Sequence, residues 1–151
     1  MYQLYIANKN YSSWSLRPWV LLRHLGIEFE ECLEPFEAED NFEKFRKFSP
    51  SGTVPCLVDG DAVVWDSLAI VEYLAEREAG IWPDKASARD FARCASAEMH
   101  SSFSSLRKIC PMNCAITVAL SSLNADLARD VSRIDELWQE GLARFGGGFL
   151  A

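Results

Sequence analysis

The sequence has no long hydrophobic run, and none of its apolar stretches approaches the roughly 20 residues that a membrane-spanning helix needs. It also lacks an excess of positive charge, because its formal net charge is -7 at pH 7. Non-specific binding to nucleic acid requires positive charge that displaces counterions from the phosphates, and anionic membrane surfaces repel an acidic protein. The sequence therefore predicts no membrane span and neither a nucleic-acid nor a membrane partner.

A secretory leader and a disulfide framework are missing as well. The first ten residues, MYQLYIANKN, lack the basic start, long apolar middle and small-residue cleavage site of a signal peptide. The five cysteines are odd in number and scattered, and only the two in CPMNC lie close together: Cys32, Cys56, Cys94, Cys110 and Cys114. No second close pair completes a zinc site. We expect buried, reduced thiols, no metal ion and a cytoplasmic location.

The first half of the chain alternates between the period of strands and the period of helices. With 49% hydrophobic and 25% charged residues, the 151-residue chain has the composition of a folded globular protein. Asp59-Gly60 suits the tight turn of a β-hairpin. The patterns predict a strand at 2–7, a helix ending at Gly26, a strand at 27–33, a helix at 38–48, a hairpin formed by 54–58 and 62–65, and a helix at 66–80. Residues 1–80 are therefore expected to form one α/β domain.

The second half is expected to be all-helical. A linker at 81–86 contains Pro83, and residues 87–151 form the second predicted domain. One long helix is predicted at 88–110, followed by an ambiguous stretch at 111–124 and a helix at 125–148. The last of these helices carries apolar residues on one face: Leu127, Val131, Ile134, Leu137, Trp138 and Leu142.

The stretch NYSSWSLRPW, at 10–19, places three serines before an apolar run. Pro18 fits the first turn of a helix if Ser13 or Ser15 is the cap, because first-turn N–H groups have no intrahelical partner. One interpretation is that all three serines only cap and turn the chain. The other is that one serine caps the helix and another faces a bound group.

Four motifs favour the second interpretation by resemblance. YSSWSLRP, SPSGTVPCL, WDSLAIVEYLAE and ARCASAEMHSSF resemble the cytosolic glutathione transferases, in particular the serine-type bacterial and zeta-like members. The resemblance runs from Met1 to about Arg144. It implies a thioredoxin-like N-terminal domain, with a mixed four-stranded sheet and helices, followed by an all-α domain. We expect that second domain to be incomplete here, because the helix that follows the Gly-rich turn in the family is absent.

The implied function is activation of glutathione for attack on a small hydrophobic electrophile, as in detoxification. By resemblance, Ser12 is the catalytic residue that contacts the sulfur, and Ser13 lies beside it in the glutathione site. A free thiol has a pKa of about 8.5, so a thiolate at neutral pH needs roughly two units, or about 2.7 kcal/mol. One hydrogen bond to a charged group contributes about 1.5–3 kcal/mol, and a helix N-terminus adds about 0.3–1. One serine at a helix start is therefore sufficient.

The other glutathione contacts implied by the resemblance lie in the downstream motifs. Val54 pairs its backbone with the cysteinyl part of glutathione, and Pro55 follows it through a cis peptide bond. Asp66 accepts from the ammonium of the γ-glutamyl end, whereas Ser67 binds its carboxylate at a helix N-terminus. Thr53 departs from the lysine or glutamine that is common in the family.

The second substrate is expected between the two domains, near Trp14, Met99 and Phe103, although Met99 and Phe103 at helical spacing also fit a helical core. The family also implies a homodimer. Trp14 stands where the zeta pattern has cysteine, which argues against the isomerase chemistry of that class. Two alternatives remain open: a non-catalytic member that binds glutathione or a protein, and a glutathione-dependent isomerase or peroxidase.

Overall fold

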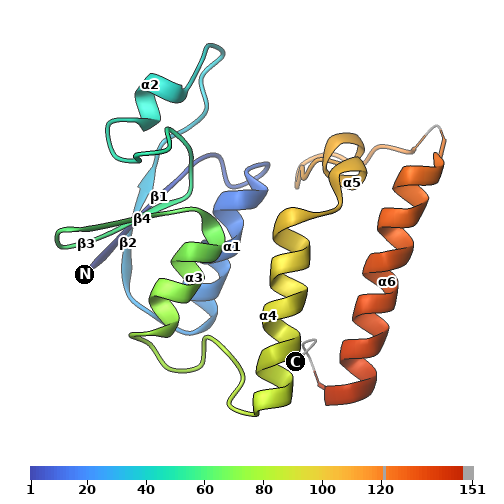
Figure 1. Cartoon of the computed structure of the whole chain (residues 1–151). Helices are drawn as coiled ribbons and strands as arrows, with labels where there is room; N and C mark the ends of the chain where they lie inside the picture. The colour runs from blue at the N-terminus through green and yellow to red at the C-terminus, as the bar shows by residue number, and fades with distance from the viewer. Residues whose placement is uncertain (121, 148–151) are drawn as a thin grey trace. The chain divides into compact units, whose positions relative to one another are not determined.

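A computed structural model describes residues 1–120 and 122–147 of the chain. It divides into two compact units, Met1–Ile81 and Trp82–Ala151, which are described separately below. Figure 1 shows the mixed α/β character of the first unit and the helices of the second.

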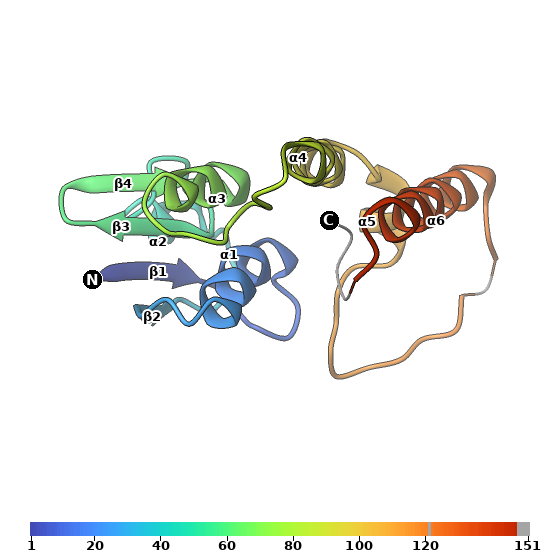
Figure 2. The ribbon, with the colours of Figure 1, turned by 90° about the horizontal axis from the view of Figure 1, so that it is seen from below.

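The first unit contains four short strands and three helices. Their bounds are β1 (Tyr2–Ile6), α1 (Ser13–His24), β2 (Phe29–Leu33), α2 (Phe42–Phe45), β3 (Cys56–Asp59), β4 (Ala62–Trp65) and α3 (Ser67–Ala75). The sheet order is β2-β1-β3-β4, as Figure 2 shows. β1 is parallel to β2 and antiparallel to β3, and β3 and β4 form the hairpin. This mixed sheet with its helices is the thioredoxin-like fold that the resemblance implied.

One face of the sheet is covered by α1 and α3. The alternation of β1 points Leu4 and Ile6 to this face, where they pack against Leu22 of α1 and Ile70 of α3. All four side chains are almost completely buried. Because helix and sheet share this one core, the positions of the α1 and α3 N-termini are fixed relative to the strands.

Three predicted helices of the first unit differ in their bounds. α2 has only four residues, because Asn41 and Asp40 hold the chain before it in turns through side-chain hydrogen bonds. α3 ends at Ala75, five residues before Gly80. α1 begins at Ser13, which places Pro18 inside the helix, so Pro18 has no N–H to donate to the carbonyl of Trp14.

The second unit contains α4 (Ala86–Ser101), α5 (Ser104–Ile109) and α6 (Ala125–Phe145). Phe91 and Ala95 of α4 pack against Leu137 of α6. Among the described residues, no helix is long and apolar enough to cross a membrane. Residues 111–120 and 122–124 have no regular secondary structure.

One expectation for the second unit is wrong. The single helix predicted at 88–110 is interrupted at Phe103, which adopts a left-handed conformation with φ 62° between α4 and α5. The predicted apolar face of α6 is only partly buried: Leu127 and Leu137 are covered, whereas Val131, Trp138 and Leu142 are exposed. Gly148, the predicted end of the last helix, lies outside the described residues.

Candidate active site

The register of the sheet brings the predicted site segments to one end of the first unit. Tyr5, near the end of β1, pairs with Cys56, the first residue of β3. Cys56 in turn pairs with Trp65, the last residue of β4. The loop after β1, the chain before β3 and the start of α3 therefore meet at the same edge. These segments carry Ser12, Val54–Pro55 and Asp66–Ser67.

Ser12 occupies the N-cap position of α1 and is 6% exposed. Its backbone N–H donates to the Asn8 carbonyl at 2.8 Å, and its carbonyl accepts from Leu16 N–H at 3.1 Å. Its side chain makes no capping hydrogen bond. The Oγ instead donates to the Oγ of Ser15 at 2.9 Å. The hydroxyl of Ser12 thus stays beside the N-terminus of a twelve-residue helix without being used to cap it.

The expectation that another serine caps α1 is wrong. Ser13 is the first residue of the helix and is half-buried. Ser15 lies in the first turn and is 2% exposed, and its Oγ accepts from the N–H of Ala7 at 3.2 Å. From the sequence, Ser15 is only a candidate cap, and its contact with Ser12 was not predicted. The signal that could have revealed it was the i, i+3 spacing, which puts the two hydroxyls on one side of the helix.

The chain before β3 forms a corner at Val54–Pro55, where the peptide bond is cis, as predicted. Val54 is half-buried and Pro55 is buried. A row of hydroxyls leads up to this corner, since Ser51 Oγ lies 3.1 Å from Ser49 Oγ and 2.6 Å from the Oγ1 of Thr53. Thr53 itself is exposed, so the position where the family has lysine or glutamine carries a short polar side chain that faces solvent.

Asp66 and Ser67 begin α3 in an unusual way. Asp66 is the N-cap, and its carboxylate accepts from the N–H of Leu68 at 2.8 Å. Its φ of 76° lies in a region that residues other than glycine rarely adopt. Ser67 is 1% exposed, and its Oγ has no hydrogen-bond partner among the described residues. A strained backbone beside a buried, unsatisfied hydroxyl is the combination that marks ligand sites, because a ligand can supply the missing partner.

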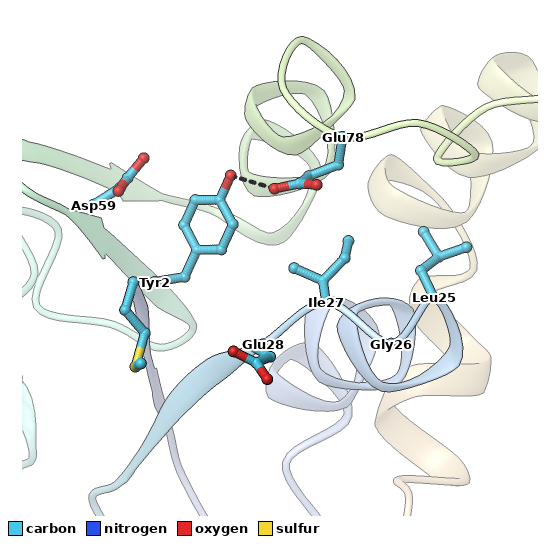
Figure 3. Close-up of a pocket in the computed structure, with 8 residues that line it drawn as sticks. Tyr2, Leu25, Gly26, Ile27, Glu28, Asp59 and Glu78 are labelled. Carbon is cyan, nitrogen blue, oxygen red and sulfur yellow. Dashed lines mark hydrogen bonds between the residues drawn. The ribbon is translucent and has the colours of Figure 1, made fainter.

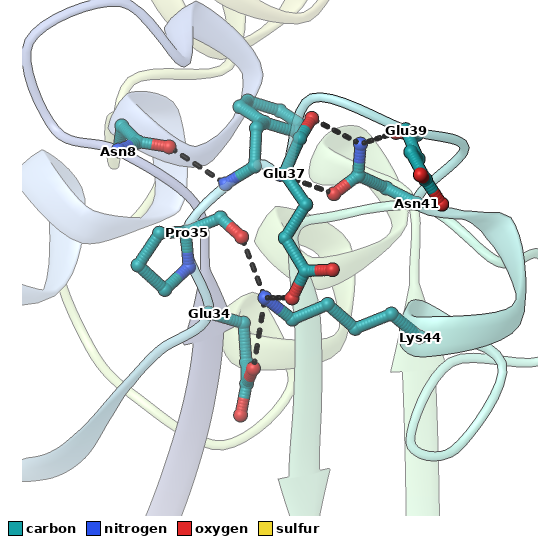
Figure 4. Close-up of polar contacts among 8 residues, drawn as sticks. Asn8, Glu34, Pro35, Glu37, Glu39, Asn41 and Lys44 are labelled. Carbon is teal, nitrogen blue, oxygen red and sulfur yellow. Dashed lines mark hydrogen bonds and ion pairs between the residues drawn. The ribbon is translucent and has the colours of Figure 1, made fainter.

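The loop that carries Ser12 is tied to the segment after β2. The side-chain oxygen of Asn8 accepts from the N–H of Phe36 at 2.8 Å (Figure 4). Its backbone carbonyl accepts from the N–H of Ser12. Lys44 and Asn41 in turn fix that segment, through contacts with Glu34, Pro35, Glu37 and Glu39. Asn8 is a positioning residue that the sequence analysis did not identify.

The cysteine expectation is only partly correct. Cys56 is buried, but Cys94, Cys110 and Cys114 are exposed and Cys32 is half-buried. Burial raises the pKa of the Cys56 thiol, whose Sγ donates to the carbonyl of Phe48. This thiol, next to the Val54–Pro55 corner, is therefore protonated at neutral pH and is a poor nucleophile.

The residues expected to line a second-substrate pocket fall in different units. Trp14, in α1, is half-buried, and the Arg17 guanidinium lies 4.1 Å from its ring centroid. Met99 is half-buried in α4, and its carbonyl accepts a hydrogen bond from Arg107. Phe103 is buried between α4 and α5. The grouping of these three residues around one substrate stays a prediction.

A separate pocket of about 590 Å³ lies at the opposite end of β1 (Figure 3). Its lining includes Tyr2, Glu28, Asp59 and Glu78. Tyr2 donates to Glu78 Oε1 at 2.8 Å, and burial together with this carboxylate raises the pKa of Tyr2 to about 12. The phenol therefore stays protonated, and none of the predicted site residues lines this pocket.

The first unit thus combines a mixed four-stranded sheet with a cis-proline corner and the N-termini of α1 and α3. Residues 11–77 match the family model described as the glutathione S-transferase N-terminal domain. By this match, residues 11–77 form a domain of the glutathione S-transferase N-terminal type.

Individual relatives agree with this assignment. Over 76 residues the chain is 40% identical to glutathione S-transferase 1 of Dianthus caryophyllus, a stretch that covers 50% of this chain and 34% of that protein. It is 40% identical over 74 residues to glutathione S-transferase Z1 of Arabidopsis thaliana, a stretch that covers 46% of this chain and 34% of that protein. A Burkholderia glutathione transferase homologue with bound glutathione superimposes with a TM-score of 0.59 at 26% identity, covering 71% of this chain and 60% of that one. The matched stretches thus span about a third of the length of these curated relatives.

Proposed function

We propose that this chain is a glutathione transferase that binds glutathione at the end of the sheet where β1, β3 and β4 meet α1 and α3. The observation that carries the proposal is the buried Ser67 hydroxyl without a hydrogen-bond partner, at the first residue of α3. A family match over residues 11–77 and a relative whose structure contains bound glutathione support the choice of ligand.

The γ-glutamyl end of glutathione is a zwitterion, and the start of α3 has groups for both of its charges. Ser67 Oγ and the N-terminal N–H groups of α3 donate to the carboxylate. The carboxylate of Asp66, which is exposed, attracts the ammonium. The backbone of Val54 pairs with the cysteinyl backbone as an added strand would.

This placement puts the glutathione sulfur near the start of α1. Ser12 donates a hydrogen bond to the thiolate, and the helix N-terminus adds a favourable partial charge. The thiol proton leaves to water, so the serine stabilises the thiolate without taking a proton. Ser13 contributes to the wall of the same site.

The second substrate in this proposal is a small hydrophobic electrophile near Trp14, Met99 and Phe103. We also propose a cytoplasmic homodimer, as is typical of the family. The domain limits that we propose are 1–80 for the glutathione-binding domain, 81–86 for the linker and 87–151 for the helical domain.

A second candidate function is a non-catalytic member that binds glutathione or a protein partner. One observation favours it: the helical unit leaves several large apolar side chains exposed, including Trp138 on α6 and Val118 in the preceding segment. Such residues suit a binding surface.

Turnover of the full chain with glutathione and a panel of halogenated aromatic, epoxide and peroxide substrates distinguishes the two candidates. The transferase proposal predicts conjugation that depends on glutathione and falls at least tenfold in Ser12→Ala. Glutathione binding measured by calorimetry without any turnover supports the non-catalytic member instead. If glutathione does not bind, both forms of the glutathione proposal are wrong.

A further inference from the structure

Two buried hydroxyls lie next to each other at the start of α1. Ser12 and Ser15 are 6% and 2% exposed, and their Oγ atoms are 2.9 Å apart. Ser15 Oγ also accepts from the backbone N–H of Ala7 at 3.2 Å, directly after β1. The three groups therefore form one hydrogen-bonded chain that begins at a backbone amide and ends at Ser12.

The number of protons in this series of hydrogen bonds limits which group Ser12 can donate to. A serine hydroxyl has one proton to donate and two lone pairs that accept. In the structure, Ser12 donates its proton to Ser15, and Ser15 accepts both this proton and that of Ala7. Ser12 therefore cannot donate to a thiolate while the bond to Ser15 keeps this direction.

The direction of the bond can reverse without movement of the oxygen atoms. A hydroxyl proton rotates about its C–O bond, so the same Oγ–Oγ pair serves with either serine as donor. The backbone N–H of Ala7 can neither rotate nor lose its proton, so it is always a donor and fixes one end of the series of hydrogen bonds. Successive hydrogen bonds in one direction polarise each other and strengthen the last one.

We propose that Ser15 is a positioning residue whose hydroxyl donates to Ser12 when glutathione binds, so that the proton of Ser12 turns to the thiolate. The order is then Ala7 N–H to Ser15, Ser15 to Ser12, and Ser12 to sulfur. No covalent bond changes in this step, and the thiol proton goes to water. The inference rests on the proposed function, because it needs a thiolate beside Ser12.

A purely structural role for Ser15 would be to satisfy the amide of Ala7. Both roles predict that Ser15→Ala lowers stability, because a buried N–H loses its partner. Only the proposed role predicts a change in the pKa of the bound thiol that depends on Ser12. The thiol pKa in a double-mutant cycle therefore separates the two roles.

The experiment titrates the ultraviolet absorbance of the glutathione thiolate bound to the full chain, in wild type, Ser15→Ala, Ser12→Ala and the double variant. We expect Ser15→Ala to raise the pKa of the bound thiol by about half a unit, or roughly threefold less thiolate at neutral pH, because polarisation changes a bond by about 10–30%. Ser15→Thr, which keeps a hydroxyl, should restore the wild-type pKa. In the Ser12→Ala background, Ser15→Ala should have no further effect. Glutathione affinity measured at about pH 5, where the thiol is protonated in every variant, should stay within about twofold.

The outcomes separate this inference from the function on which it rests. If wild type does not bind glutathione, or if Ser12→Ala leaves the thiol pKa unchanged, the proposed function fails and the inference fails with it. Two results would contradict only the reversal of the bond between Ser15 and Ser12. In the first, Ser12→Ala raises the thiol pKa but Ser15→Ala does not. In the second, Ser15→Ala raises the thiol pKa by the same amount in the Ser12→Ala background as in wild type. Should Ser15→Ala not fold, Ser15→Cys replaces it: a weaker donor must raise the pKa in the same direction, and an unchanged pKa overturns the inference.

Discussion

Ser67 combines burial with an unsatisfied hydroxyl, and this has opposite consequences for stability and for binding. Its Oγ has no partner among the described residues, whereas Asp66 provides the helix cap. Removing the hydroxyl therefore breaks no hydrogen bond within the described part of the protein. It removes a donor for the glutathione carboxylate, which is worth about 1–3 kcal/mol for a charged group.

Ser67→Ala should accordingly weaken glutathione binding by about 5- to 150-fold while leaving the free energy of unfolding unchanged or slightly higher. Isothermal calorimetry and urea unfolding measure the two effects. Ser87→Ala is a useful control, since Ser87 is exposed on α4 and lies outside the proposed glutathione site. An unchanged affinity in Ser67→Ala would place the carboxylate site elsewhere.

The start of α3 shows why the sequence predicted one part of the proposed site and not another. The dipeptide Asp66-Ser67 before an apolar helical run predicts a capped helix start, and the cap is present. The φ of 76° and the burial of Ser67 depend on how the chain leaves β4 and packs against the sheet. Neither property has a local sequence signal.

At the scale of elements, the sheet register is what assembles the site. The row Cys32, Tyr5, Cys56 and Trp65 crosses all four strands, so the loops after β1, β2 and β4 and the segment before β3 leave the same edge. The strand patterns and the Asp59-Gly60 turn predicted the strands and the hairpin. The pairing of β1 with β3 is long-range, so it followed only from the family resemblance.

Helix ends were the least predictable elements. Ser13 or Ser15 was the predicted cap of α1, but the helix begins at Ser13 because Ser12 takes the N-cap position through its backbone, not through its side chain. The break between α4 and α5 occurs at Phe103, where the N–H of Leu106 donates to Asp130 of α6. This partner lies 24 residues away in the sequence, so helical periodicity did not reveal the break.

The ion pair between Glu98 of α4 and Arg133 of α6 predicts a pH effect within the helical unit. Arg133 donates to Glu98 through Nε at 2.7 Å and Nη2 at 3.0 Å. These hydrogen bonds lower the pKa of the Glu98 carboxyl below its ordinary value. The pair therefore stabilises the folded unit fully above the ordinary carboxyl pKa of about 4.3, and the contribution is lost as the pH falls through the lowered pKa.

Glu98→Gln should lower the free energy of unfolding modestly at neutral pH, since both side chains are partly exposed to water. The difference from wild type should shrink as the pH falls below about 4. Urea unfolding at several pH values measures this. Glu140→Gln, which breaks an ion pair within α6 alone, is the matched control and should have a smaller effect. A difference between Glu98→Gln and wild type that does not vary with pH would contradict the assignment.

At the scale of the whole molecule, the two units contribute different evidence. The first unit contains the complete family match, the cis-proline corner and both helix N-termini of the proposed site. The second unit has a small core around Phe91 and Leu137, with exposed apolar residues on α6. All residues of the proposed glutathione site therefore lie in the first unit, whereas the residues proposed for the electrophile come from both units.

The central claim is that this protein stabilises the thiolate of bound glutathione through Ser12. The most direct measurement is the pKa of the glutathione thiol bound to the full chain, followed by thiolate absorbance, in wild type, Ser12→Ala and Ser13→Ala. We expect a wild-type pKa about one to two units below that of free glutathione, loss of most of this lowering in Ser12→Ala, and little change in Ser13→Ala. A bound thiol that titrates like free glutathione, or a shift lost in Ser13→Ala but kept in Ser12→Ala, would contradict it.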